Sequence, residues 1–182
     1  WGMGISQHVH GTDNSRCLIA LSLITGHVGR PGTGLHPLRG QNNVQGASDA
    51  GLIPMVYPNY QSVEDIDIRS FFEDKWGRSL DPSKGLTVVE IMNRIVSGQM
   101  FGMYVMGENP AMSDPDQNHA RLALSKLQHL VVQDIFFTET AWFADVIFPA
   151  SAQPEKAGTY TNSNRQVQIG MPVRKMPGKA KQ

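Results

Sequence analysis

The stretch that decides the fold is Met103-Tyr104-Val105-Met106-Gly107-Glu108-Asn109-Pro110, an apolar run of the kind found in buried strands followed by a polar loop. Leu130-Val131-Val132 and Val146-Ile147-Phe148 repeat the apolar part of this pattern further along the chain. Strands that are apolar on both faces and alternate with helices are typical of a parallel sheet covered by helices. We therefore predict an α/β fold, an αβα sandwich with a mostly parallel sheet.

Helical patterns precede or separate these strands. Thr87-Val88-Val89-Glu90 has the form of a capping box, which predicts a helix start. Its apolar stripe consists of Val88, Ile91, Met92 and Ile95. Asp114 followed by Pro115 predicts a second helix start, and the stripe of that helix consists of Ala120, Ala123, Leu124 and Leu127. Residues 138–143 predict a short helix before the last strand.

The loops that follow the three strands are the places where we expect a ligand. Parallel sheets bind ligands outside the carboxyl ends of their strands, at a point where the strand order reverses. These loops are residues 107–110, Gln133-Asp134 and residues 149–151.

The amino-terminal part has a different pattern. Residues 2–5 predict a short strand, and a helix follows with Thr12 or Asp13 as its cap and Gly26 at its exit. The apolar stripe of this helix consists of Cys17, Leu21, Ile24 and Val28. Residues 29–62 are rich in glycine and proline and show no sustained period. A loop of that length is usually functional or disordered.

Composition excludes several classes of protein. The 182 residues include 16 basic and 16 acidic side chains, so the basic footprint of a nucleic-acid-binding protein is missing. One cysteine allows no intramolecular disulfide, zinc cage or cysteine-ligated cluster within the chain. The longest mostly apolar run, residues 17–25, is too short for a membrane span. We expect a cytoplasmic protein and, because neither end has the character of a natural terminus, an internal segment of a longer chain.

The densest polar signal is the loop from Pro37 to Ala47, which contains Arg39 and four side-chain amides. Amides both donate and accept hydrogen bonds, and glycine allows the backbone to approach a ligand closely. An arginine fork suits a carboxylate or a phosphate held by two parallel hydrogen bonds. On composition alone, a polar surface loop explains the segment about as well as a binding site.

The order of motifs resembles the formate dehydrogenases of the molybdopterin oxidoreductase family, and the run Arg-Gly-Gln-Asn-Asn-Val-Gln-Gly at residues 39–46 is the most specific of them. The resemblance covers nearly the whole chain in one register. The segments that carry it are residues 2–5 with Gln7, residues 10–13, 25–34, 37–49, 106–110, 132–136 and 144–149, and finally Glu155, Gly158 and Asn164-Arg165.

This resemblance implies a large multidomain molybdopterin enzyme that oxidises formate to carbon dioxide at molybdenum or tungsten held by two pyranopterin guanine dinucleotides. It implies that Arg39 lies beside the metal and faces formate. The positions that it assigns to cofactor binding are Gln7, Gln41, Asn109, Ser113, Gln133 and Ala150. Asn109 departs from relatives that carry aspartate, and Ala150 from relatives that carry serine.

The resemblance also implies parts that this chain does not contain. Family members bind the metal through a cysteine or selenocysteine followed by histidine, whereas Cys17 is followed by Leu18 and is expected to be a core residue. We therefore expect the metal ligand and the 4Fe-4S cluster ligands to lie outside this chain, with no metal ligand inside it. None of the six histidines has paired ligand spacing, and we expect them to be solvated or locally hydrogen-bonded. Formate and electron-transfer subunits or a redox partner would be the partners of the parent enzyme.

Within that enzyme, the resemblance implies that the chain passes between two dinucleotide-binding-like domains. Residues 1–41 would end one domain, residues 42–152 would form a second αβα cofactor-binding domain, and residues 153–182 would begin a return to the cluster-bearing domain. Two other functions stay open: a cofactor-binding or structural fragment without turnover, and a related molybdopterin oxidoreductase acting on nitrate or another oxyanion. The formate-type arginine loop argues against the second of these.

Overall fold

The computed structural model describes residues 1–182 and divides the chain into two compact units. One unit contains residues 1–53, 57–60 and 159–169, and the other contains residues 54–56, 61–158 and 170–182. These units follow from contacts within this chain. The domain limits predicted at residues 41 and 152 concern a larger protein and stay a prediction.

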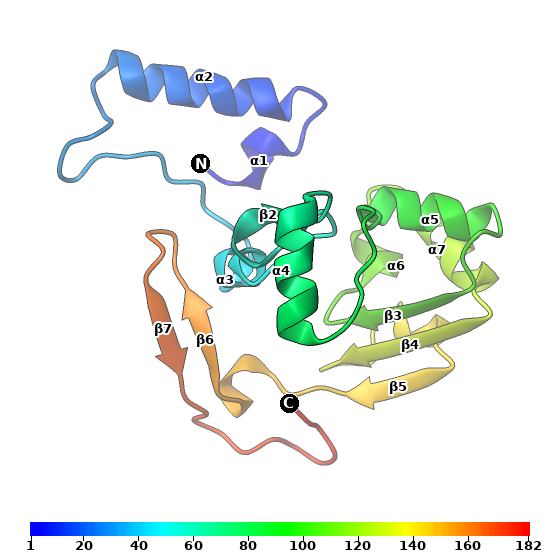
Figure 1. Cartoon of the computed structure of the whole chain (residues 1–182). Helices are drawn as coiled ribbons and strands as arrows, with labels where there is room; N and C mark the ends of the chain where they lie inside the picture. Colours follow the sequence, from blue (N-terminus) through cyan, green and yellow to red (C-terminus); the bar gives the residue numbers. More distant parts are fainter. The chain divides into compact units, whose positions relative to one another are not determined.

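The larger unit is built on a parallel sheet of three strands, β3 (Gly102–Met106), β4 (His129–Asp134) and β5 (Val146–Pro149), in the order β3-β4-β5 (Figure 1). Val105 lies opposite Val132, and Val132 lies opposite Ile147. The predicted α/β class and parallel sheet are confirmed.

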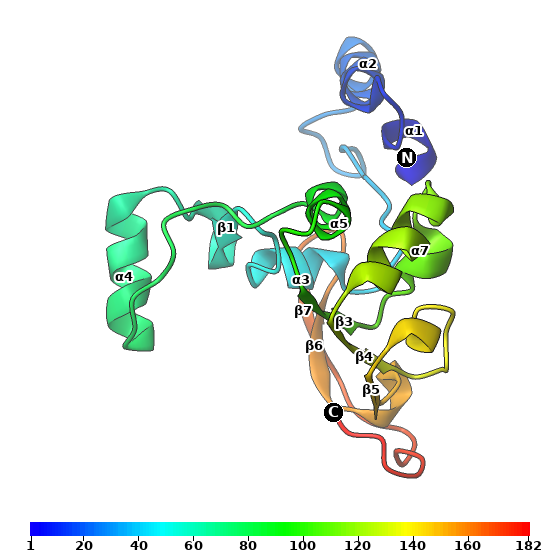
Figure 2. The same cartoon turned by 90° about the vertical axis from the view of Figure 1, so that its right-hand side faces the viewer.

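Helices α5 (Val88–Val96), α6 (Pro110–Ser113) and α7 (Gln117–Lys126) and the 3-10 turn η2 (Ala141–Phe143) accompany this sheet. Figure 2 views the strands nearly edge-on, with α7 on one side of them. Most of the two predicted stripes is buried or partly buried, but Val88, in the first turn of α5, is 52% exposed and does not belong to the core. The buried core consists of Met92, Ile95, Val105, Ala111, Ala120, Ala123, Leu124, Leu130, Val132 and Ala141. Burying these apolar side chains is the main favourable contribution to the stability of the unit.

The helices cover one face of the sheet. On β3, Val105 is 4% exposed, whereas its neighbours Tyr104 and Met106 are 51% and 65% exposed. Successive residues of a strand point to opposite faces, so this alternation shows which face the helices leave open. All four residues of β5 are exposed, and the prediction that this strand is buried is wrong, because the hydrophobic core forms on β3 and β4 and includes no residue of β5.

Helix starts and ends follow local hydrogen bonding. The capping box of α5 is confirmed: Thr87 Oγ1 accepts from the Glu90 amide at 3.4 Å, and the Glu90 carboxylate accepts from the Thr87 amide at 2.7 Å. The helix predicted to begin at Asp114 begins instead at Gln117, because Asp114 is extended (ψ 139°) and Asp116 caps the helix. The helix predicted over residues 138–143 is reduced to η2.

The rest of this unit includes helix α4 (Ile66–Trp76) and the 3-10 turn η3 (Gln153–Glu155). Asp65 caps α4 by accepting from the amides of Asp67 and Ile68, and Gly77 ends it with φ +65°. Phe72 is the buried side chain of α4. Short strands β1 (Val56–Tyr57) and β2 (Gln61–Ser62) pair with each other on either side of the 3-10 turn η1 (Pro58–Tyr60).

The smaller unit begins with two helices. The strand predicted over residues 2–5 is wrong: this segment forms helix α1 (Met3–Ser6), because it has no neighbouring strand and instead bonds locally, with the Gln7 amide donating to the Met3 carbonyl at 2.7 Å. Helix α2 (Gly11–Ile24) begins one residue before Thr12, and neither predicted residue is its cap. The prediction that Gly26 marks the end of this helix is confirmed, since Gly26 follows the C-cap Thr25 and has a left-handed backbone with φ +68°.

The side chain of Cys17 is exposed, and the prediction that it is a core residue is wrong. Leu21, Leu23 and Ile24 on the same helix are also more than half exposed. The apolar residues of α2 therefore lack a covering element within this chain. The long loop predicted over residues 29–62 is also interrupted, because Val44–Asp49 form helix α3. Strands β6 (Gly158–Thr161) and β7 (Val167–Gly170) pair as a two-stranded sheet.

Candidate functional site

The loop that carries Arg39 is anchored by the residue pair Asn43 and Gly46. The Asn43 side chain accepts from the Thr161 amide at 3.0 Å and donates to the Thr159 carbonyl at 3.2 Å, which fixes the start of α3 against β6. A Cβ added at Gly46 would lie 2.2 Å from Asn43 Oδ1. Position 46 therefore requires glycine for a close approach, as the sequence suggests for this loop.

Arg39 itself is exposed, and its guanidinium is held at one nitrogen. Arg39 Nη1 donates to Gln45 Oε1 at 2.8 Å. Gln45 Nε2 in turn donates to Asp49 Oδ1 at 2.8 Å and to Tyr60 Oη at 3.2 Å. Gln45 is only 7% exposed. Sequence reasoning did not single out Gln45, although its spacing of four from Asp49 on a helix was a usable signal.

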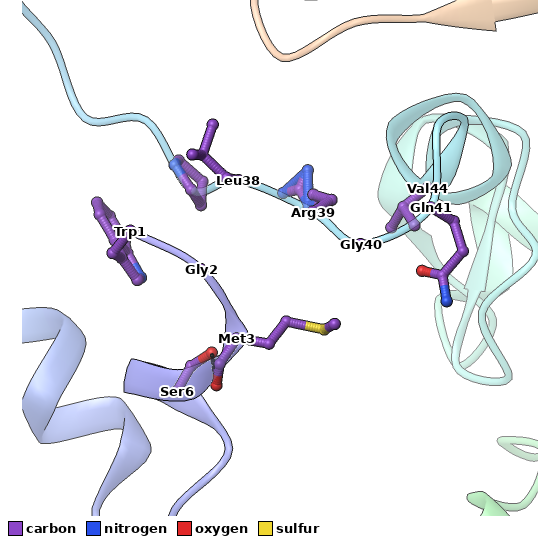
Figure 3. Close-up of a pocket in the computed structure, with 10 residues that line it drawn as sticks. Trp1, Gly2, Met3, Ser6, Leu38, Arg39, Gly40, Gln41 and Val44 are labelled. Carbon is purple, nitrogen blue, oxygen red and sulfur yellow. Dashed lines mark hydrogen bonds between the residues drawn. The ribbon is translucent and has the colours of Figure 1, made fainter. Parts of the chain in front are cut away.

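Arg39 lies beside a hollow of about 220 Å³, shown in Figure 3. Its lining residues are Trp1, Gly2, Met3, Ser6, Pro37, Leu38, Arg39, Gly40, Gln41 and Val44. The amino-terminal residues lie along the loop because the Leu38 amide donates to the Trp1 carbonyl at 2.6 Å and the Trp1 amino group donates to the His36 carbonyl at 3.0 Å. The structure thus brings Arg39 and Gln41 to one hollow.

A second hollow, in the larger unit, lies at the carboxyl ends of the parallel strands. It has a volume of about 450 Å³ and takes residues from all three predicted loops. The lining residues are Met106, Gly107, Gln133, Asp134, Ile135, Ala150, Ser151, Ala152, Gln153, Lys156, Lys181 and Gln182. We call it the strand-end pocket. It brings Gln133 and Ala150 together.

The side chain of Gln133 has a defined orientation in the strand-end pocket. Tyr104 Oη donates to Gln133 Oε1 at 2.5 Å. The oxygen end of the amide is thus used within the protein, and the Nε2 end keeps two N–H groups that a ligand acceptor can use. Sequence reasoning missed Tyr104, which lies on the neighbouring strand two residues before Met106, the register partner of Gln133.

The match to known proteins covers the residues of both hollows. The family model of the molybdopterin oxidoreductases matches residues 1–182, the whole chain. The chain belongs to the molybdopterin oxidoreductase family. Membership of this family implies a cofactor of the molybdopterin type with molybdenum or tungsten.

Individual relatives are similar over most of this chain. An F420-dependent formate dehydrogenase subunit alpha of Methanocaldococcus jannaschii is 49% identical over 98% of the chain. A probable oxidoreductase of Bacillus subtilis, YjgC, is 48% identical over 92%. The chain spans 26% of the first protein and 17% of the second. Among solved structures, acetylene hydratase from Pelobacter acetylenicus aligns with 77% of this chain and 18% of its own length, at a TM-score of 0.49 and 18% identity.

The strand-end pocket contains polar and positively charged groups that suit a polar, anionic ligand. Ser151 is 5% exposed, lines the pocket, and its hydroxyl has no hydrogen-bond partner in the structure. A buried hydroxyl without a partner is costly, so it favours a ligand that supplies one. Lys156 and Lys181 add positive charge to the lining and Asp134 adds a carboxylate. The residues present therefore fit an anionic cofactor of the molybdopterin type, and Ser151 is a residue that sequence reasoning missed.

Asn109 does not line the strand-end pocket. Its amide nitrogen donates to Glu139 Oε2 at 2.7 Å, and its oxygen accepts from the Thr140 amide at 3.1 Å and the Thr140 hydroxyl at 2.8 Å. The hydrogen bond from Asn109 also holds the pKa of Glu139 below its usual value. Asn109 thus ties the loop after β3 to the segment before η2. Its predicted cofactor contact stays a prediction.

Ser113 and Gln7 also lie apart from the two hollows described above. Ser113 is exposed and borders an apolar hollow of about 430 Å³ that Val88 and Met92 also line. Gln7 is exposed at the end of α1, where its amide nitrogen contacts Met3 Sδ at 3.6 Å. Their assignment to the cofactor rests on the family resemblance.

The rings of two of the six histidines bond locally, and the ring of His129 lies 3.7 Å from the Asp145 carboxylate. His8 Nε2 lies 2.6 Å from the Gly4 carbonyl, and His27 Nδ1 lies 2.9 Å from Thr25 Oγ1. Nowhere in residues 1–182 do three or more His, Cys, Asp or Glu side chains gather to hold a metal ion. None of the helices has both the length and the apolar character that crossing a membrane requires.

Proposed function

We propose that this chain is part of the catalytic subunit of a formate dehydrogenase, and that Arg39 holds the substrate. The observation that supports this proposal is the exposure and the anchoring of the Arg39 side chain. Its guanidinium is exposed beside a hollow and fixed through Nη1 by Gln45 at 2.8 Å. The relatives named formate dehydrogenase, at 44–49% identity over most of the chain, support the choice of formate.

The chemistry of formate explains why an arginine is needed. Formate is a one-carbon carboxylate, and its oxidation to carbon dioxide releases one proton and two electrons from its C–H bond. Only its two oxygens can be held, and a guanidinium holds both through parallel charge-assisted hydrogen bonds. Arginine also stays protonated at any working pH. Holding the oxygens leaves the C–H bond directed away from Arg39.

A bound molybdopterin centre would supply the electron acceptor for this oxidation. We propose the form with two guanine dinucleotides, and we assign Gln133 Nε2 and the Ser151 hydroxyl to hydrogen bonds with it. Lys156 and Lys181 would balance the negative charge of its phosphates. Gln41, in the same hollow as Arg39, would contact the cofactor near the substrate.

A substrate comparison on the purified full-length protein tests this proposal. Formate should reduce an artificial electron acceptor, and neither nitrate nor another oxyanion should accept electrons from a reduced dye. Acid release of nucleotide should give guanine nucleotide in a stoichiometric amount. Turnover of nitrate without turnover of formate would replace the proposal with the oxyanion reductase alternative.

A further inference from the structure

We propose that Gln45 is a positioning residue that fixes the Arg39 guanidinium and keeps its Nε–Nη2 edge free for the substrate carboxylate. This inference rests on the proposed role of Arg39 in binding formate. It assigns a task to a buried glutamine whose side chain does not reach the substrate but contacts the group that does.

The orientation of the Gln45 amide is determined by its partners. A carboxylate oxygen accepts hydrogen bonds and does not donate them. The end of Gln45 that lies 2.8 Å from Asp49 Oδ1 must therefore be Nε2. The other end, Oε1, then points to Arg39 Nη1, which can only donate. Asp49 thus dictates that Gln45 presents an acceptor to the arginine.

The amide is also held rigidly in place. Gln45 and Asp49 are four residues apart on α3, so their side chains lie on the same side of the helix. Tyr60 Oη lies 3.2 Å from Gln45 Nε2, and the Arg165 guanidinium lies over the Tyr60 ring at 5.9 Å. A long arginine side chain has many rotamers, and one fixed anchor removes most of that freedom before substrate binds.

The anchor determines which edge of the guanidinium remains available. Gln45 uses Nη1, whereas Nε and Nη2 have no hydrogen-bond partner in the structure. Nε and Nη2 present two parallel N–H groups, the arrangement that matches the two oxygens of a carboxylate. The geometry therefore points to a side-on contact between Arg39 and formate, with Gln45 behind the guanidinium.

A double-mutant cycle in the full-length holoenzyme separates positioning from a general structural role. Gln45→Leu removes the three side-chain hydrogen bonds of Gln45, to Arg39, Asp49 and Tyr60, at similar side-chain size. Gln168→Leu, at an exposed glutamine of β7, is the matched control. We expect Gln45→Leu to lower kcat/KM for formate roughly tenfold to a hundredfold, because hydrogen bonds to charged groups have effects of that order. Guanine nucleotide content and the control variant should stay at the parent level. In an Arg39→Ala background, Gln45→Leu should have no further effect.

A polarity exchange provides a rescue. Gln45→Glu alone places two carboxylates side by side, and formate turnover should fall. Adding Asp49→Asn turns the side chain at position 49 into a donor toward the carboxylate at position 45, which still presents an acceptor to Arg39, so the pair of changes should recover part of kcat/KM. Recovery would support the relay from Asp49 through Gln45 to Arg39.

Two results would overturn the inference: an unchanged kcat/KM in Gln45→Leu, or a Gln45→Leu loss of the same size with and without Arg39. Either can occur while Arg39→Ala still loses formate turnover, in which case only the role of Gln45 fails. If Arg39→Ala itself keeps the parent rate, the proposed function fails first.

Discussion

Gln133 and Asn109 are both amides that follow neighbouring parallel strands, but their hydrogen bonds give them different capacities. Asn109 uses its nitrogen for Glu139 and its oxygen for Thr140. Gln133 uses only its oxygen, which Tyr104 occupies. Residue type and position after a strand are visible in the sequence, whereas partners about 30 residues away are not. The same reason kept Ser151 out of the sequence predictions, since its burial and the missing partner of its hydroxyl are not visible in the sequence. Gln45 was missed although its spacing from Asp49 was a signal in the sequence.

At the residue scale, we predict that the strand-end pocket retains the cofactor through Gln133 and Ser151. Gln133→Ala and Ser151→Ala in the full-length protein should each lower guanine nucleotide content after dilution or mild heating, because each removes a donor facing the pocket. His119→Ala is the control, since His119 does not line this pocket. Loss of nucleotide from the histidine variant alone, with both pocket variants intact, would show that the pocket is misassigned.

At the element scale, the sequence predicted segments whose signal is local. The capping box at Thr87 and the stripe of α7 were correct, because caps and helical periodicity depend on residues three or four apart. The strand predicted over residues 2–5 was wrong because a four-residue segment with two large apolar side chains is compatible with strand or helix. The helix predicted to start at Asp114 starts later, because Asp116, two residues further on, is its cap. The prediction that Cys17 is a core residue was wrong for a different reason, because burial depends on which segment covers α2.

The capping box yields a prediction for α5. Thr87→Ala removes the hydroxyl that accepts from the Glu90 amide, and loss of such a cap costs about 1 kcal/mol. Amide hydrogen exchange across residues 88–96 should become roughly fivefold faster in the variant, whereas Thr87→Ser should stay close to the parent.

The capping box should also depend on pH. The hydrogen bonds from Thr87 lower the pKa of Glu90, so the stabilisation by this carboxylate is present above its usual pKa. It should be lost as the pH falls through the lowered pKa. Equal exchange rates in parent and Thr87→Ala at neutral pH would contradict the account of this helix start.

At the scale of the whole molecule, the chain holds two polar sites in two units, one around Arg39 and one at the strand ends. The α/β class and the parallel sheet were predictable because three apolar strands alternate with helices along the chain. The exposed face of the sheet and the exposed apolar residues of α2 were not predictable from the sequence. The chain spans about a quarter or less of the length of its relatives, and burial depends on the whole protein. Pattern alone indicates which side chains are apolar and leaves open which segment covers them.

A further prediction at this scale concerns a preparation that contains only these 182 residues. The family resemblance implies a metal ligand that is a cysteine or selenocysteine followed by histidine, whereas the single cysteine of these residues, Cys17, is followed by Leu18. We therefore expect this preparation to contain no stoichiometric molybdenum or tungsten and to show no formate oxidation. Elemental analysis by mass spectrometry, on protein of verified intact mass, measures this directly. One metal ion per chain would contradict the expectation.

The substrate role of Arg39 is tested most directly by the kinetics of two substitutions in the full-length enzyme. Arg39→Lys keeps the charge but loses the planar fork, and losing one charge-assisted bond of roughly 1.5–3 kcal/mol should lower kcat/KM for formate about tenfold to a hundredfold. Arg39→Ala should be worse, and Arg16→Ala, at an exposed arginine of α2, serves as the control. Metal and guanine nucleotide contents should match the parent in all three. An Arg39→Ala enzyme that keeps its cofactor and oxidises formate at the parent rate would contradict the account.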